Sequence, residues 1–325
     1  MLKIGFVGCG WANGMHMRNL AGLDGVSLAA FYDPDESRAQ QAAAQYHGTA
    51  YTDSAKLVAE AELDVLYVAV PPGAHGIEPQ AAQRGLHIFA EKPIATQMSL
   101  ACEIAAAIEG AGVVSAVGYH FRYLDACRKA KALLADKTVG MLLGYWVSSM
   151  PPVEWWRQMA LSGGQAVEQT THIFDLARWL VGEVEEVFAF QANRASQDIP
   201  KFDIWDVGAV NLKFKNGVVG TMHSSCLVEQ NFRIGLDVIC KDLTLAVDGN
   251  RLAVTEPGRK EEFSFSNDYY LEEDKAFIAA IQSGDKAAVQ SPYADALQTL
   301  AVTLAATRSA TEARPVCVVE MFGSA

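Results

Sequence analysis

The first 118 residues alternate short apolar runs with alanine-rich stretches, and this alternation limits the folds open to the chain. Runs of Val, Ile and Phe favour strands, whereas Ala, Gln and Glu favour helices. Strands that alternate with helices predict a parallel sheet covered on both faces. We expect strands at 3–7, 26–32, 65–70, 87–90 and 113–118, and helices at 12–23, 34–46, 55–62, 76–84 and 98–111.

The pattern changes near residue 120. After a helix expected at 124–134, apolar runs are separated by turn residues, and Asn216-Gly217 and Asp248-Gly249 predict hairpins because both residues of such a pair tolerate the positive φ of a type I′ turn. We predict an α/β chain with a Rossmann-like, doubly wound dinucleotide-binding domain at 1–120 and an α+β domain for substrate binding and oligomerisation at 121–325. Its mainly antiparallel strands are expected at 142–148, 184–192, 207–214, 218–226, 232–239, 243–247 and 251–256, with helices at 165–181, 269–283 and 292–313.

The charge and the cysteine content of the chain limit the classes of function that it can have. The 26 basic and 38 acidic side chains give a net charge of −12, which repels nucleic acid and anionic lipid. The six cysteines form no C-x-x-C pair and are expected to be reduced. No signal-peptide pattern and no run of about 18–20 apolar residues is found, so we expect a cytoplasmic protein with no nucleic-acid or membrane partner.

A glycine-rich turn follows the first expected strand and opens the first expected helix. Gly8 and Gly10, followed by Trp11 and Ala12, are candidates for holding a pyrophosphate, because backbone N–H groups at a helix start attract anions. The third glycine of the usual pattern is replaced by Asn13, so the helix is expected to pack less closely on the strand or to diverge from the standard turn. A simple tight strand-to-helix turn is the alternative.

Asp33 ends the second expected strand, 23 residues after Gly10. This offset is typical of a carboxylate that binds the adenosine ribose, and a carboxylate there would repel a 2′-phosphate, so NAD is favoured over NADP. Asp33 followed by Pro34 is also a well-formed helix start, with Asp33 as the N-cap.

Two further expected strands end in proline-rich turns. Pro71 and His75 follow one, and Glu91 and Lys92 follow the other. Because ligands bind at the carboxyl ends of the strands in open α/β sheets, these residues are expected to line the same crevice as the glycine turn. His75 could instead cap the following helix, and Lys92 could be a surface residue.

These motifs together resemble the Gfo/Idh/MocA family of NAD(P)-dependent oxidoreductases. The resemblance rests on the glycine turn, "VAVPPGAH" at 68–75, Glu-Lys-Pro at 91–93, and the stretches 118–140 and 163–184. It implies hydride transfer between NAD and a hydroxyl-bearing carbon of a sugar, inositol or related polyol. It further implies a small carbohydrate or polyol as substrate, and a homo-dimer or homo-tetramer formed through the C-terminal sheet.

The second stretch resembles the family's active-site helix, with a departure. Where the family has Asp, Gly and His, this chain has Glu168, Thr170 and His172. Glu168, His172 and Asp175 are spaced to share one helix face, so His172 is the candidate general acid or base, and Glu168 or Asp175 would set its tautomer or bind substrate. A polar domain interface is the alternative. The same stripe is a poor metal signature, and no metal is expected.

Lys92 is the candidate that would polarise or deprotonate the reacting hydroxyl, because a lysine in a partly desolvated crevice gives up its proton more readily. Arg122 lies in the expected interdomain link and could contact substrate or cofactor. Trp155 and Trp156 are adjacent, and exposed paired tryptophans are costly unless they cover something. They are interpreted as a lid, a substrate wall stacking on a sugar ring, or an oligomer contact.

Two other functions fit the same motifs. One is a non-catalytic, NAD-binding regulatory protein on the same fold, which the presence of both Lys92 and His172 disfavours. The other is a glycosidase that uses a transient oxidation by bound NAD, which net NADH production would exclude.

Overall fold

A computed structural model describes residues 1–323, which form two compact units. The second unit takes up most of the chain beyond residue 120, but the segment Asp268–Leu297 groups with the first, because helix α10 (Tyr269–Ser283) packs against helix α1 (Trp11–Ala21). The domain bounds predicted from the sequence, 1–120 and 121–325, stay a prediction. The first unit comprises Met1–Ala95, Ser99–His120 and Asp268–Leu297, and the second comprises Thr96–Met98, Phe121–Asn267 and the described residues 298–323.

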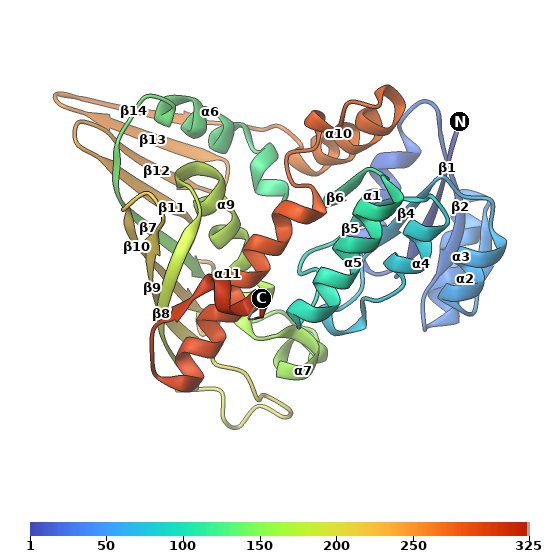
Figure 1. Ribbon diagram of the computed structural model, residues 1–325, viewed down its shortest axis with the longest axis horizontal. Helices are drawn as coiled ribbons and strands as arrows, with labels where there is room; N and C mark the ends of the chain where they lie inside the picture. The colour runs from blue at the N-terminus through green and yellow to red at the C-terminus, as the bar shows by residue number, and fades with distance from the viewer. Residues whose placement is uncertain (324–325) are drawn as a thin grey trace. The chain divides into compact units, whose positions relative to one another are not determined.

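The first unit is built on a six-stranded, fully parallel sheet with the order β3-β2-β1-β4-β5-β6 (Figure 1). The predicted doubly wound architecture is therefore confirmed. β2 and β5 have the predicted bounds, whereas the three-residue β3 was not predicted. The strands are β1 (Leu2–Val7), β2 (Val26–Tyr32), β3 (Thr49–Tyr51), β4 (Val65–Val68), β5 (His87–Ala90) and β6 (Ser115–Val117).

Helices cover both faces of this sheet. On one face Phe6, Tyr67 and Phe89 form a buried aromatic core with Phe277 of α10. On the other, the residue Gly5 lies against Leu57. The remaining helices of the unit are α2 (Glu36–Tyr46), α3 (Ser54–Glu60), α4 (Glu78–Gln83) and α5 (Met98–Ala111), the last beginning at a residue grouped with the second unit.

The second unit is built on a nine-stranded sheet with the order β14-β13-β12-β11-β7-β10-β9-β8-β15. All neighbours are antiparallel except β7 and β10, so the predicted mainly antiparallel sheet is confirmed. The edge strands β14 and β15 were not predicted. The strands are β7 (Val139–Val147), β8 (Val184–Ala192), β9 (Val207–Phe214), β10 (Val219–Ser225), β11 (Arg233–Cys240), β12 (Thr244–Asp248), β13 (Arg251–Glu256), β14 (Arg259–Ser264) and β15 (Val316–Cys317).

One face of this sheet is covered by helices, among them α6 (Asp125–Leu134) and α9 (Thr171–Val181) (Figure 1). Gly144 of β7 lies against Ile173 of α9. The predicted helix 165–181 is wrong as a single element, because the chain breaks between α8 (Gln165–Glu168) and α9. The other helices are α7 (Met159–Ser162) and α11 (Tyr293–Glu312).

The hairpin at Asn216-Gly217 joins β9 to β10 as predicted, but its turn type differs. Only Gly217 has a positive φ, at 88°, so the turn is not type I′. The Asn216 side chain instead accepts a hydrogen bond from the N–H of Val218 and donates one to the carbonyl of Val181. Because the N–H of Phe214 donates to the carbonyl of Val218 at 2.9 Å, residues 215–217 form a three-residue loop with glycine last, which accommodates this geometry.

Candidate functional site

The glycine turn, residues 8–10, is the whole connection between β1 and α1. Gly8 has a φ of +86°, and a Cβ there would lie 2.2 Å from the carbonyl oxygen of Ala69, so only glycine fits. A Cβ at Gly10 would meet nothing within 4 Å. Because α1 begins at Trp11, the free N–H groups of its first turn lie beside this open space. The turn therefore fits an approaching pyrophosphate.

The Asn13 side chain bonds the start of α1 to the end of β1 and to the glycine turn. Its side-chain amide is buried and donates hydrogen bonds to the carbonyl oxygens of Val7, at 3.1 Å, and Gly8, at 2.6 Å. The amide therefore links the start of α1 to the end of β1, and the predicted looser packing or divergence from the standard turn stays a prediction. Its Oδ1 has no hydrogen-bond partner within the described chain.

Asp33 lies next to the turn and is buried. Its carboxylate accepts hydrogen bonds from the N–H of Cys9, at 2.8 Å, and from the N–H of Asp35, at 2.9 Å. The alternative reading of Asp33 as the helix N-cap is wrong: α2 begins at Glu36, and the cap is Asp35, whose carboxylate accepts from the N–H of Ser37. Asp33 is thus held at the turn and not at the helix start.

Trp11 and Pro71 border the same edge of the sheet. Trp11 is 73% exposed and meets the ring of Tyr270 edge-on at 6.2 Å. Pro71 follows β4 and leads into a short 3₁₀ turn, Pro72–Ala74. Ala12 lies in the first turn of α1. These residues belong to one unit, and the parallel strands bring their carboxyl ends to one edge.

His75 is buried and is held by an acidic partner. Its Nδ1 hydrogen-bonds to the carboxylate of Glu78, which also accepts from the N–H of Gly76 at 2.8 Å. Burial disfavours the charged carboxylate, but His75 and the N–H contacts outweigh it and hold the pKa of Glu78 below its usual value. The N-cap of α4 is Ile77, so His75 does not cap this helix.

Glu91 and Lys92 follow the last residue of β5. Glu91 is buried, and its Oε2 accepts a hydrogen bond from the backbone N–H of Lys92 at 3.1 Å. A Cβ at Gly118 would lie 2.5 Å from the Glu91 carboxylate, so glycine leaves the space that this carboxylate fills. A cis peptide bond joins Lys92 to Pro93.

His16 belongs to the same cluster, although the sequence analysis did not single it out. Its fully buried ring bonds through Nδ1 to Asp274, at 2.7 Å, and through Nε2 to Glu91, at 3.1 Å. Burial alone would lower its pKa, but the two carboxylates outweigh burial and raise the pKa of His16 to about 10. The ring is therefore an imidazolium at neutral pH. Its partners lie 258 and 75 residues away, so no local pattern could have identified it.

His172 lies at the start of α9 in the second unit and is buried. Its ring is stacked with Phe121, at a centroid distance of 5.1 Å, and with Trp146, at 5.6 Å. Neither aromatic residue was singled out from the sequence. Together they fix the plane of the imidazole.

Glu168 is separated from His172 by the helix break, so the two do not share one continuous helix face. The Glu168 carboxylate accepts a hydrogen bond from Trp156 Nε1 at 2.5 Å. Trp156 is fully buried and packs with Ile204 and Cys226, whereas Trp155 is half-buried at the edge of this cluster. The two tryptophans are therefore not an exposed pair, because one of them is a core residue that anchors Glu168.

Arg122 and Asp175 form a buried ion pair. Arg122 Nε lies 2.7 Å from one carboxylate oxygen of Asp175, and its Nη2 lies 2.6 Å from the other. The hydroxyl of Thr299 donates to the same carboxylate at 2.9 Å. Asp175 is thus engaged by Arg122 in a bidentate contact, an arrangement that spacing along α9 did not predict.

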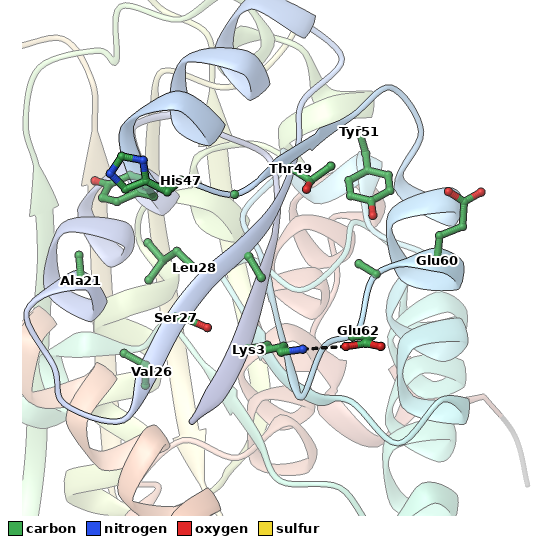
Figure 2. Close-up of a pocket in the computed structure, with 14 residues that line it drawn as sticks. Lys3, Ala21, Val26, Ser27, Leu28, His47, Thr49, Tyr51, Glu60 and Glu62 are labelled. Carbon is green, nitrogen blue, oxygen red and sulfur yellow. Dashed lines mark hydrogen bonds and ion pairs between the residues drawn. The ribbon is translucent and has the colours of Figure 1, made fainter.

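A hollow of about 680 Å³ lies at the amino-terminal side of the parallel sheet (Figure 2). It is bordered by Ser27, Thr49 and an ion pair between Lys3 and Glu62, whose charged atoms are 2.7 Å apart. The glycine turn and Lys92 lie at the carboxyl ends of the strands. This hollow is therefore not part of the candidate site.

Comparisons with known proteins agree with this geometry. A family model described as an oxidoreductase family with an NAD-binding Rossmann fold matches residues 2–119, and one described as the GFO/IDH/MocA C-terminal domain matches residues 127–246. The chain is 27% identical to myo-inositol 2-dehydrogenase of Thermotoga maritima, covering 99% of this chain and 100% of the relative.

Two further proteins are similar. An NAD(+)-dependent scyllo-inositol 2-dehydrogenase of Bacillus subtilis is 24% identical, over 69% of this chain and 67% of its own. The solved structure of levoglucosan dehydrogenase in complex with NADH superposes with a TM-score of 0.87 at 19% identity, covering 98% of this chain and 99% of that one, and this likeness supports the fold. Across residues 1–323, no helix combines the length and apolar character needed to span a membrane.

The buried cluster around His16 predicts a specific pH dependence of stability. The pKa of His16 is about 10 in the folded chain against an ordinary 6.5, so its stabilisation is complete below pH 6.5 and is lost as pH rises through about 10. We expect His16→Gln to lower the free energy of unfolding by on the order of 5 kcal/mol at pH 6 and by much less at pH 10.5. Urea unfolding at both pH values measures this. An equal loss at both would mean that the ring is neutral.

Proposed function

Because the chain belongs to the Gfo/Idh/MocA family of oxidoreductases, we propose that it moves a hydride between NAD(H) and a hydroxyl-bearing carbon of a sugar, inositol or related polyol. One observation carries the proposal. Lys92 follows β5 at the same sheet edge as the glycine turn, so a proton-handling amine and a pyrophosphate-binding turn share one side of one sheet. The inositol dehydrogenases among its relatives support a polyol as the substrate.

The cofactor would be held by residues of the first unit. When bound, NAD supplies the nicotinamide ring that accepts or returns the hydride. The backbone at Gly8, Gly10, Trp11 and Ala12 would contact the pyrophosphate. Asp33, already fixed by two backbone N–H groups, would accept a hydrogen bond from the ribose 2′-hydroxyl, and its charge would disfavour NADP. Pro71, His75 and Glu91 would form the wall of the site.

Proton transfer is assigned to Lys92 and His172. The Nζ of Lys92 would hydrogen-bond to the reacting oxygen and take its proton during oxidation, and His172 would pass that proton onward. Glu168, anchored by Trp156, would bind or orient groups near His172. Trp155, which is half-buried, would offer a ring face to the substrate. Arg122 and Asp175, which neutralise one another, would contact substrate only as a preformed pair.

The open face of the nine-stranded sheet supports assembly of a homo-dimer or homo-tetramer. Phe190 is 64% exposed there and lies in one cross-strand row with Ala209, His223 and Tyr145. A row of this kind leaves apolar surface that a second copy would bury. Sedimentation of the purified chain measures the assembly.

Cofactor preference is the first test. We expect NAD to bind more tightly than NADP, and Asp33→Ala to reduce this preference by about 1–3 kcal/mol, because a charge-assisted hydrogen bond and a repulsion are lost together. Titration of both cofactors by calorimetry measures it. Asp35→Ala is the matched control, since it removes the α2 cap two residues away and leaves the preference unchanged. Equal affinities of the native protein would remove Asp33 from the ribose contact.

Catalysis by Lys92 is the second test. With a substrate found by screening inositols and sugars for NADH formation, Lys92→Ala should lower kcat by about 10²–10⁴-fold and leave NAD affinity nearly intact. Lys92→Arg keeps the positive charge but not the proton transfer, so it should be similarly impaired. A raised KM at unchanged kcat would make Lys92 a binding contact. Hydrolysis of a glycoside without net NADH would identify a glycosidase, and NAD binding with no turnover would indicate a regulatory protein.

A shared proton path for Lys92 and His172 is the third test. If the two act in series, the double change of both to Ala should cost little more in kcat than the worse single change. Steady-state kinetics on the four proteins measures the coupling. Full additivity would contradict the path, and a His172→Ala variant that loses thermal stability but keeps kcat/KM would make His172 a packing residue.

A further inference from the structure

We propose that His16 is a positioning residue for Lys92, acting through the carboxylate of Glu91. The inference rests on the role proposed above for Lys92. His16 lies in α1, outside every motif discussed so far, yet its ring bonds to the residue that precedes Lys92. In the first unit, the end of β5 is thus held by a cluster of charged side chains, of which Glu91 directly precedes Lys92.

Two aromatic rings and two carboxylates surround the His16 ring. It is fully buried, and its centroid lies 4.7 Å from that of Phe89 and 5.3 Å from that of Tyr67, both rings being tilted against it. Both ring nitrogens face carboxylates, Asp274 at 2.7 Å and Glu91 at 3.1 Å. With both carboxylates ionised, each can only accept, so both ring nitrogens must donate and the ring is an imidazolium, in agreement with its raised pKa.

Asp274 is a firm support for this ring. The fully buried carboxylate also accepts from the Tyr67 hydroxyl, at 3.1 Å, and from the Asn19 amide, at 2.9 Å. These donors come from β4 and α1, while Asp274 belongs to α10. Three separate elements therefore determine where the imidazolium lies.

Glu91 transmits this position to Lys92. One of its oxygens accepts from His16, and the other accepts from the Lys92 backbone N–H at 3.1 Å. The close approach of Gly118 leaves the carboxylate no space to turn on that side. The imidazolium thus holds the carboxylate, and the carboxylate holds the first peptide after β5, from which the Lys92 side chain starts.

The charge of the cluster depends on His16. Asp274 and Glu91 contribute two negative charges and His16 one positive charge, so these three side chains together carry a single net negative charge. Of the other groups facing the cluster, His120 adds no charge, because burial and the nearby Lys92 and His16 hold its pKa well below the usual value. Tyr270 is likewise neutral, since burial raises its pKa. Glu273, on the same helix as Asp274, is buried and faces Tyr270.

The decisive experiment follows the charge of the Lys92 amine directly. In protein labelled with ¹³C at the lysine ε carbons, the Lys92 signal, identified by its loss in Lys92→Arg, is titrated by NMR with and without saturating NAD. His16→Gln leaves two uncompensated carboxylates, so the midpoint of the Lys92 titration should rise by about one pH unit. Combining His16→Gln with Asp274→Asn restores the charge balance and should return the midpoint toward that of the native protein.

The matched control is His87→Gln. His87 lies at the other end of the same strand, β5, where its Nδ1 accepts from the N–H of Val114 at 2.9 Å. This change removes a comparable structural contact far from Lys92 and should leave the Lys92 midpoint unchanged. An unshifted midpoint in His16→Gln, or an equal shift in His87→Gln, would overturn the proposal.

Two measurements keep the test decisive. If His16→Gln does not fold, the ring of His16 in the native protein is titrated instead: a ring doubly protonated up to about pH 9 supports the proposal, and titration near pH 6.5 overturns it. Kinetics then separates this proposal from the proposed function. A Lys92→Ala variant with unchanged kcat refutes the role of Lys92, whereas an impaired Lys92→Ala beside a His16→Gln with native kcat, KM and pH profile refutes only the role of His16.

Discussion

The hydrogen-bonded ladder that places β1 between β2 and β4 decides where chemistry in the first unit can occur. Because all six strands run the same way, the glycine turn, Asp33, the Pro71 turn and Lys92 all emerge at one edge. The contact of Gly8 with the Ala69 carbonyl fixes how closely the β1 and β4 connections pass. Backbone pairing therefore brings the polar groups of the candidate site to one edge, where side-chain hydrogen bonds hold the glycine turn and the first peptide after β5.

Much of this architecture could be predicted from the sequence, because its strands are apolar and its helices rich in alanine. β2 and β5 were predicted to the residue. Three strands were missed for physical reasons: β3 has only three residues, β15 only two, and β14 is a charged edge strand whose Arg, Lys and Glu side chains hide the strand pattern. Such strands are stabilised by their neighbours and not by local preference.

The site was predictable where its signal is local and unpredictable where it depends on distant partners. The glycine turn and the Glu-Lys-Pro stretch are short motifs, and both lie at strand ends as expected. The ion pair of Arg122 with Asp175 spans 53 positions, and the contact of His16 with Asp274 spans 258. The helical spacing of Glu168, His172 and Asp175 gave a wrong prediction, because periodicity cannot show that the helix is interrupted at Gln169 and Thr170.

Asn13, at the third position of the three-glycine motif, shows which structural role that position has. The usual third glycine lets helix and strand approach by having no side chain, whereas here an amide links them by donating to the carbonyls of Val7 and Gly8. A motif search that required glycine at position 13 would miss this chain. The three-glycine motif describes only one way of connecting the first strand to the first helix. Relatives that carry a side-chain amide at the equivalent place would form a class recognisable by the hydrogen bonds that hold the turn. Replacing the amide by glycine would remove both of its bonds, although the Val7 carbonyl would keep the bond that it accepts from the N–H of Ala69.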